Sequence, residues 1–282
     1  MWNLDYESVK EISALMESHG YAMSKKFGQN FLLPEYIREK IVSGMGDISG
    51  KAVWEVGPGF GSITSVMLKK GADLTCFEID HGFAEILRTE AFADEPNFRL
   101  VEGDALKTLF QQEGKPDVVC GNLPYNVGSV IIASLIENGI LPDVMVYTLQ
   151  KEVVDRMCSK ENRDDYSSFS VLTQFDYENK LSFVIGRGNF WPEPKVDSAV
   201  VVMKKRTGKF LPDEERKEFF LLVRALFAQR RKTVRNNLLQ ICPKEKVDEV
   251  LAGAGLTGKE RAETLSRDKM LELYQSRKRV LA

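Results

Sequence analysis

Short apolar runs alternate with stretches of helical periodicity along most of the chain. The apolar runs have the length of buried strands and are bounded by turn-forming residues. Helical patterns separate the earlier runs, and this order predicts an α/β fold with a mainly parallel sheet. We predict strands at 52–56, 74–77, 98–101, 118–120 and 144–149, with further strands within 174–186 and 198–204.

Helical periodicity is clear at the N-terminus and again in the C-terminal region. Residues 5–18 carry an apolar stripe, and Ser8 and Glu11 have the spacing of a capping box. A basic tract with Gly208 and Pro212 resembles a linker, and a mainly helical region follows it. We predict further helices at 35–45, 62–68 and 213–227.

These patterns divide the chain into three regions. Residues 1–23 form an N-terminal helical extension, 24–206 form the α/β domain, and 207–282 form a small helical domain. Within the α/β domain, glycines follow the first predicted strand, Glu78 ends the second, Asp104 follows the third, and Asn122 follows the fourth. Because parallel strands end at one edge of a sheet, we expect these residues to line one cleft.

The glycine turn after the first strand has the pattern E-x-G-P-G-x-G, beginning at Glu55. Gly57 and Gly59 would let the backbone approach a ligand closely. Glu78 fits a ribose-binding carboxylate in either a nicotinamide or an S-adenosylmethionine site, but the glycine spacing and Glu55 favour S-adenosylmethionine. Asp104 fits an acceptor for the amino group of the cofactor's adenine, or a helix N-cap. A turn that binds no ligand is the remaining alternative.

The motif after the fourth strand suits a planar nitrogenous base. The Asn122 side chain and the Leu123 carbonyl can accept hydrogen bonds from an exocyclic amino group, on a turn built by Pro124. Tyr125 can stack on one face of the base, with Phe190 as the candidate for the other face. A simple Pro-Tyr turn and a core aromatic are the structural alternatives. The four-residue motif resembles the catalytic motif of amino-methylating nucleic-acid methyltransferases.

Composition limits the classes of protein to which this chain can belong. Hydrophobic residues at 43% and charged residues at 28% are typical of a globular protein, and the net charge of -2 argues against indiscriminate nucleic-acid binding. His19 and His81 lack metal-ligand spacing, so we expect no metal site. The scattered cysteines and the lack of a long apolar run indicate a reduced, cytoplasmic setting away from membranes.

Several motifs occur in the order seen in rRNA adenine N6-dimethyltransferases. They lie at 28–32, 55–61, 78–80, 103–106, 122–126, 150–153, 190–198 and 230–236. Together they resemble this family across roughly residues 24–268, and most of all its bacterial small-subunit (16S) members. The resemblance implies a Rossmann-like class I methyltransferase sheet with a small helical C-terminal domain, and S-adenosylmethionine as cofactor. It also implies cofactor contacts at Asn30, Leu32, Gly57, Glu78, Asp104 and Asn122.

The resemblance further implies two adjacent adenosines of 16S rRNA, in a pre-30S subunit, as the substrate of a monomeric enzyme. Basic residues near the predicted cleft and in the helical region are candidates for phosphate contacts, although a solvated charged face is the ordinary alternative. These candidates are Lys25, Lys26, Arg224, Arg230, Arg231, Lys232 and Arg235.

Three other functions compete with this interpretation. A related enzyme methylates one adenine of large-subunit rRNA and confers antibiotic resistance. A ribosome-assembly factor would read the same RNA without transferring methyl, but it would not need the motif at Asn122 to Tyr125. A nicotinamide dehydrogenase is disfavoured by the glycine spacing.

Overall fold

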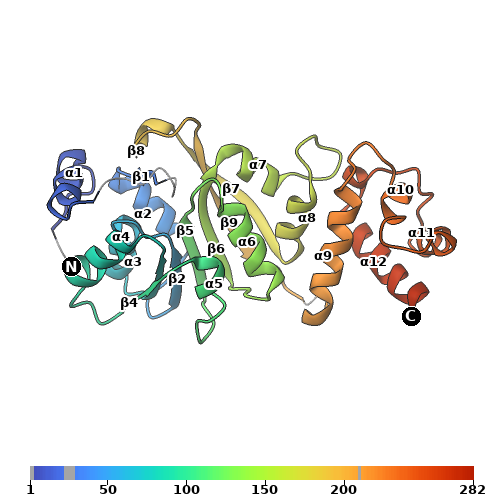
Figure 1. Ribbon diagram of the computed structural model, residues 1–282, viewed down its shortest axis with the longest axis horizontal. Coiled ribbons are helices and arrows are strands. Elements are labelled where there is room, and N and C mark those ends of the chain that lie inside the picture. The colour runs from blue at the N-terminus through green and yellow to red at the C-terminus, as the bar shows by residue number, and fades with distance from the viewer. Residues whose placement is uncertain (1–2, 22–28, 209–210) are drawn as a thin grey trace. The chain divides into compact units, whose positions relative to one another are not determined.

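The computed structural model describes residues 3–21, 29–208 and 211–282 (Figure 1). The chain divides into two compact units. Unit 1 comprises residues 1–132, 142–154 and 180–205, and unit 2 comprises 133–141, 155–179 and 206–282. Two segments that we predicted within the α/β domain, 133–141 and 155–179, thus group with the C-terminal helices. The predicted domain boundaries remain a prediction.

A seven-stranded sheet has the order β4-β3-β2-β5-β6-β9-β7, and β1 pairs with β8 separately. Neighbours from β4 to β6 are parallel, whereas β9 is antiparallel to β6. The strands are β1 Phe31–Leu32, β2 Ala52–Val56, β3 Asp73–Glu78, β4 Phe98–Glu102, β5 Val118–Asn122, β6 Val144–Gln150, β7 Tyr177–Ile185, β8 Phe190–Trp191 and β9 Ser198–Lys205. The predicted α/β fold with a mainly parallel sheet is confirmed.

Helices connect the parallel strands and make up most of the C-terminal region (Figure 1). The first seven are α1 Val9–Ser18, α2 Glu35–Ser43, α3 Ser62–Lys69, α4 His81–Ile86, α5 Ala105–Thr108, α6 Gly128–Glu137 and α7 Lys151–Cys158. The others are α8 Ser168–Phe175, α9 Asp213–Phe227, α10 Val234–Leu238, α11 Val247–Gly253 and α12 Arg267–Leu281. Short π or 3-10 turns lie at Leu87–Ala91, Arg187–Asn189, Lys244–Lys246 and Ala262–Thr264.

The first helix begins later than its apolar pattern predicts. Ser8 is the N-cap of α1, and its side chain accepts a hydrogen bond from the Glu11 backbone amide. The Glu11 carboxylate bonds instead to the Asp5 amide, at 3.1 Å, so the reciprocal half of the capping box is replaced by a longer link. Ile12 and Met16 of α1 pack with Phe60 and Phe83 in a small apolar cluster of unit 1.

The strand order places a crevice at the centre of the parallel sheet. β2 lies between β3 and β5, so the chain leaves β2 toward one side of the sheet and later returns to its other side. The main core of unit 1 includes fully buried Val53 and Leu74 from this region. In such sheets, ligands bind beyond the carboxyl ends of the strands at the point where the order reverses.

Unit 2 has its own aromatic core. The rings of Phe175 and Phe219 lie 4.6 Å apart between centroids, and Phe219 packs edge-on against Tyr274. The guanidinium of Arg216 is buried beside this cluster and pairs with Asp176 through both terminal nitrogens. A buried pair of this kind needs both partners, because either charge alone would be costly in an apolar core.

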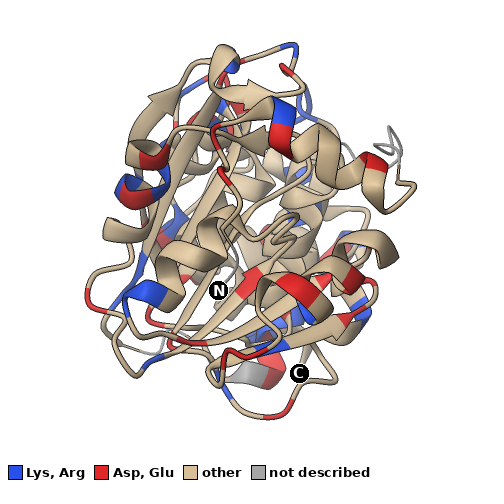
Figure 2. Ribbon diagram, turned by 90° about the vertical axis from the view of Figure 1, so that its left-hand side faces the viewer, with Lys and Arg blue, Asp and Glu red and all other residues tan. Residues whose placement is uncertain are grey.

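Acidic and basic positions are interspersed along the ribbon (Figure 2). Within the described ranges, no helix combines the length and apolar character needed to cross a membrane. Across the same residues, no group of three or more His, Cys, Asp or Glu side chains could hold a metal ion.

Candidate functional site

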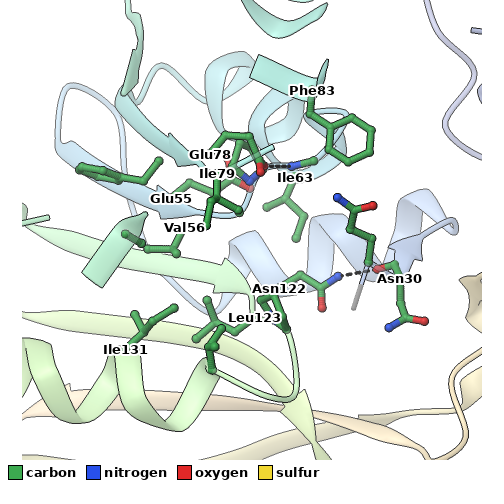
Figure 3. A pocket seen from close by; sticks show the side chains of 18 of the residues that line it. Asn30, Glu55, Val56, Ile63, Glu78, Ile79, Phe83, Asn122, Leu123 and Ile131 are labelled. Atoms are coloured by element: carbon green, nitrogen blue, oxygen red, sulfur yellow. Dashed lines mark hydrogen bonds between the residues drawn. The ribbon is translucent and has the colours of Figure 1, made fainter. Parts of the chain in front are cut away.

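A cavity of about 330 Å³ opens at the carboxyl ends of β2, β3, β4 and β5 in unit 1 (Figure 3). It brings together all of the residues predicted to contact the cofactor and the four-residue catalytic motif. The predicted residues lining it are Asn30, Leu32, Gly57, Gly59, Glu78, Asp104, Asn122, Leu123, Pro124 and Tyr125. Segments far apart in the sequence therefore meet at one point, while their contacts with a ligand remain predictions.

The glycine turn forms one wall of the cavity. Gly57 has a φ of 70°, and a Cβ on it would meet no heavy atom within 4 Å. Because Gly57 lines the cavity, a side chain there would take up part of the cavity volume. Gly61 has a different role: a Cβ on it would lie 2.5 Å from the Phe92 ring, so this glycine allows the turn to pack on the core.

Glu78 lies at the end of β3, and its carboxylate is hydrogen-bonded to the glycine turn. One carboxylate oxygen accepts the Gly59 amide at 3.1 Å, and the other accepts the Asp80 amide at 2.9 Å. Burial raises the pKa of Glu78 to about 7, although the two backbone hydrogen bonds oppose the shift. The carboxylate is thus fixed in orientation, and each oxygen keeps lone-pair capacity for a further donor.

Glu55 is a second buried carboxyl group lining the cavity, near the end of β2. Its Oε2 accepts hydrogen bonds from the Thr64 hydroxyl at 2.6 Å and the Cys76 thiol at 3.5 Å. Burial raises the pKa of Glu55 to about 7 as well. Two buried carboxyl groups in one cavity favour a cationic ligand.

Asp104 and Asn122 complete the polar lining. Asp104 is the N-cap of α5, with Oδ1 accepting the Leu106 amide at 3.0 Å, so the structural role considered for it is present. The Asn122 side-chain amide donates to the Asn30 carbonyl at 2.9 Å (Figure 3). This hydrogen bond orients the amide so that its oxygen is the acceptor left for a ligand.

The rest of the catalytic motif forms a braced turn. The Leu123 amide donates to the Thr148 carbonyl, which ties the turn to β6. The Pro124 carbonyl accepts hydrogen bonds from the backbone amides of Val127 and Gly128, and the chain then enters α6. The Tyr125 hydroxyl lies 2.7 Å from the Ser198 hydroxyl at the start of β9, and burial raises the pKa of Tyr125.

Several apolar residues of the cavity were not predicted from the sequence. Phe83, Ile63 and Ile79 line it, and Phe83 packs against the Phe31 ring with centroids 5.5 Å apart. Ile79 is 48% exposed directly after Glu78, which is unusual for isoleucine. Its position beside a predicted ribose-binding carboxylate was the signal available in the sequence.

Phe190 is not brought to the cavity. It is 3% exposed, belongs to the main core of unit 1, and pairs with Leu32 between β8 and β1. This burial matches the core-aromatic alternative, and stacking on a base remains only a prediction for this ring. Lys25 and Lys26 lie outside the described residues.

The other predicted RNA contacts lie in unit 2, around the turn between α9 and α10. Arg224 pairs with Glu137, Arg230 donates to the Asp164 carbonyl, and Arg235 forms a bidentate pair with Asp248. Arg231 and Lys232 are exposed in the same turn. Intramolecular contacts therefore occupy part of this basic group.

Comparison with known proteins decides the family. The family model described as Ribosomal RNA adenine dimethylase matches residues 21–278. The chain belongs to the ribosomal RNA adenine dimethylase family. The family resemblance read from the motifs is thereby confirmed, as are the methyltransferase class and S-adenosylmethionine as the methyl donor of this family.

Relatives within this family match nearly the whole chain. The Ribosomal RNA small subunit methyltransferase A of Treponema denticola is 42% identical, covering 93% of this chain and 92% of its own. The protein of the same name from Borreliella burgdorferi is 39% identical, covering 84% and 83%.

Solved structures agree with the family assignment. A dimethyladenosine transferase from Plasmodium falciparum superimposes with a TM-score of 0.73 at 25% identity, covering 86% of this chain and 95% of its own. The 23S rRNA methyltransferase ErmE superimposes with a TM-score of 0.64 at 25% identity, covering 88% and 100%.

The cavity fits the family's methyl donor. S-adenosylmethionine carries a positive sulfur and an ammonium group, and two buried carboxyl groups line the cavity. The open space at Gly57 admits a ligand against the glycine turn. Glu78, Asp104, Asn30 and Leu32 all line this cavity, and their contacts with the cofactor remain predictions.

Proposed function

We propose that this protein transfers methyl groups from S-adenosylmethionine to N6 of two adjacent adenosines near the 3′ end of 16S rRNA. The product is N6,N6-dimethyladenosine, formed during small-subunit biogenesis on a pre-30S subunit by a monomeric, cytoplasmic enzyme. The observation that carries the proposal is the Asn122 amide, held by the Asn30 carbonyl with its oxygen available beside the cavity. The family assignment and the small-subunit names of its relatives support it.

The chain's own residues would position the adenine rather than act as strong bases. The Asn122 oxygen and the Leu123 carbonyl accept the amino protons, which directs the nitrogen lone pair away from the ring plane. Tyr125 stacks on the base, braced through its hydroxyl by Ser198. When bound, the cofactor supplies a methyl group already activated by its positive sulfur, so alignment of the two reactants provides much of the acceleration.

The target adenine must leave its helix to reach this site. A base carrying one methyl has a single proton left to donate, so one of the two acceptors must then tolerate an apolar neighbour. We assign RNA contacts to Lys25 and Lys26 and to the helical region 207–282. In that region the exposed Arg231 and Lys232 are the leading candidates.

Labelled methyl transfer tests the proposal directly. Purified protein would be incubated with methyl-labelled S-adenosylmethionine and small subunits from cells lacking the modification, with large-subunit RNA alongside. We expect label in small-subunit RNA, recovered as N6,N6-dimethyladenosine. Label only in large-subunit RNA would favour the activity named for ErmE, and subunit binding without label would favour an assembly factor.

The Asn122→Ala variant tests the role of the central residue. We expect methyl transfer to fall at least ~100-fold, because the variant loses both an acceptor and the brace to Asn30. Binding to the small subunit should stay within twofold of the wild-type protein. Loss of subunit binding with turnover retained would contradict the assigned role.

A further inference from the structure

A second hollow, of about 380 Å³, lies on the surface of unit 1. The function proposed above assigns no role to its residues. Three basic side chains, two carboxylates and one valine line it. They are Lys151, Glu152, Arg187, Lys195, Val196 and Asp197.

Asp197 is hydrogen-bonded to both of the other segments that line this hollow. Its carboxylate accepts the Arg187 backbone amide at 3.0 Å, and its carbonyl accepts the Lys151 backbone amide at 3.0 Å. The Arg187 guanidinium is itself positioned by Glu193, at 2.8 Å from Nε. Backbone hydrogen bonds thus gather basic residues from three segments at one place, so the cluster is built by the fold.

The hollow adjoins the loop that carries Tyr125. Gln150 and Ser198 are register partners at the ends of β6 and β9, and the hollow begins with the next residues, Lys151 and Asp197. The Ser198 hydroxyl lies 2.7 Å from the Tyr125 hydroxyl. One hydrogen bond and one peptide link therefore separate the proposed stacking ring from the hollow.

We propose that this hollow binds a phosphodiester of the rRNA strand beside the target adenosine, an inference that rests on the proposed function. A base held against Tyr125 carries its flanking phosphates with it, and basic side chains hold phosphates regardless of sequence. The hollow holds Lys151, Arg187 and Lys195 beside Glu152 and Asp197. Asp197 already accepts a backbone amide, and Glu193, outside the lining, pairs with Arg187 through Nε. Because the contact ignores base identity, it would serve either of two adjacent adenosines when the strand shifts by one nucleotide.

Two matched pairs of lysines test the inference. The Lys151→Ala/Lys195→Ala variant removes two charges from the hollow. The Lys51→Ala/Lys115→Ala variant removes two exposed charges just before β2 and β5, at the opposite edge of the parallel sheet. We would measure binding to undermethylated small subunits and KM for methyl transfer across a series of KCl concentrations, with cofactor affinity by calorimetry.

We expect the hollow pair to raise both Kd and KM for the subunit about tenfold and to lower the salt slope by about 1.5. The kcat at saturating subunit and the cofactor affinity should stay within twofold. The control pair should behave as the wild-type protein. The Lys151→Arg/Lys195→Arg variant should recover most of the affinity, because it keeps both charges.

Three outcomes would overturn the inference: unchanged affinity in the hollow pair, equal losses in both pairs, or no recovery in the arginine variant. Failure of the proposed function looks different. In that case the wild-type protein would transfer no methyl to small subunits, whereas the binding comparison between the two lysine pairs would still report on the hollow.

Discussion

Glu78 accepts backbone hydrogen bonds through both of its carboxylate oxygens, yet burial raises its pKa to about 7. Between the ordinary value of 4.5 and this value, the folded protein holds a proton that the unfolded chain releases. The stability contributed by this proton is complete below 4.5 and is lost as the pH rises through about 7. The group is therefore poised to change charge when a ligand arrives.

The raised pKa of Glu78 predicts that cofactor binding depends on pH. In the proposed complex, ribose hydroxyls would donate hydrogen bonds to the carboxylate and so lower the pKa of Glu78. We expect affinity for S-adenosylmethionine to rise about tenfold from pH 6 to pH 8, with proton release on binding near pH 6.5. Calorimetry in buffers of different ionisation enthalpy measures both quantities.

The Glu78→Gln variant should bind weakly and lose most of the proton release. The Glu55→Gln variant is the control, because Glu55 also titrates near 7 and its change should leave the Glu78 component in place. Wild-type affinity that does not vary between pH 6 and 8 would contradict the ribose assignment.

At the scale of elements, two glycines in the turn between β2 and α3 have different surroundings: Gly61 packs against the core, and Gly57 lines the cavity. Gly61 and Gly57 both have positive φ, of 80° and 70°, but only Gly61 faces a wall, the ring of Phe92. We expect Gly61→Ala to lower the free energy of unfolding by about 3 kcal/mol. Gly57→Ala should cost about 1 kcal/mol in stability.

The two alanine variants should differ in the opposite sense toward the cofactor. Gly57→Ala places a methyl group in the cavity and should weaken cofactor binding. Gly61→Ala should weaken it less, when the affinity is measured on the protein that remains folded. Urea unfolding and calorimetry measure the two effects. Equal losses of stability would show that backbone conformation alone governs this turn.

The brace between β9 and the catalytic turn gives a second prediction at this scale. Ser198→Ala removes the partner of the Tyr125 hydroxyl, and Tyr125→Phe removes the hydroxyl itself. We expect each change to lower kcat/KM for the small subunit about tenfold, with the double variant no worse than either single variant. Steady-state methyl transfer measures this cycle, with cofactor affinity as the unchanged reference. Fully additive losses would mean that the two residues act separately.

The bounds of some elements were predicted to the residue. The helix at Asp213–Phe227 has the predicted bounds, and the strand at Ala52–Val56 does too. The first helix starts at Val9 rather than at residue 5, because the Ser8 side chain caps it there.

Side chains facing the cavity were harder to predict than the elements carrying them. The polar residues at strand ends were identifiable because a parallel sheet brings its carboxyl ends together. Phe83 and Phe190 are both aromatic residues near a predicted cleft, yet only Phe83 lines it. Which ring faces the ligand depends on the packing of segments distant in sequence, which a local pattern does not encode.

At the scale of the whole molecule, the chain divides into two compact units. Arg216 is 2% exposed and its partner Asp176 is 8% exposed, and both belong to unit 2. Arg216→Ala would leave Asp176 buried without its countercharge, at a cost of about 3 kcal/mol. The cofactor cavity lies wholly in unit 1 and shares no residue with this pair.

We therefore expect Arg216→Ala to speed amide hydrogen exchange in residues 206–282 while cofactor affinity stays within twofold. Hydrogen exchange read by mass spectrometry, with calorimetry, checks both. An Arg216→Met/Asp176→Leu variant is the matched control, because it removes both charges and should be far less destabilising. Equally faster exchange in both units would contradict the separation.

The hydrogen bond from Asn122 ends on the main-chain carbonyl of Asn30 rather than on its side chain. Substitutions at the two ends of this hydrogen bond, positions 30 and 122, should therefore have unequal effects. Any residue at position 30 still presents a carbonyl, so variation there would keep the acceptor of this hydrogen bond. Variation at position 122 removes the donor to this carbonyl and the proposed acceptor for the adenine in one step. If Asn30 contacts the methyl donor as proposed, a lineage could alter that contact through residue 30 and still keep the carbonyl that holds the Asn122 amide.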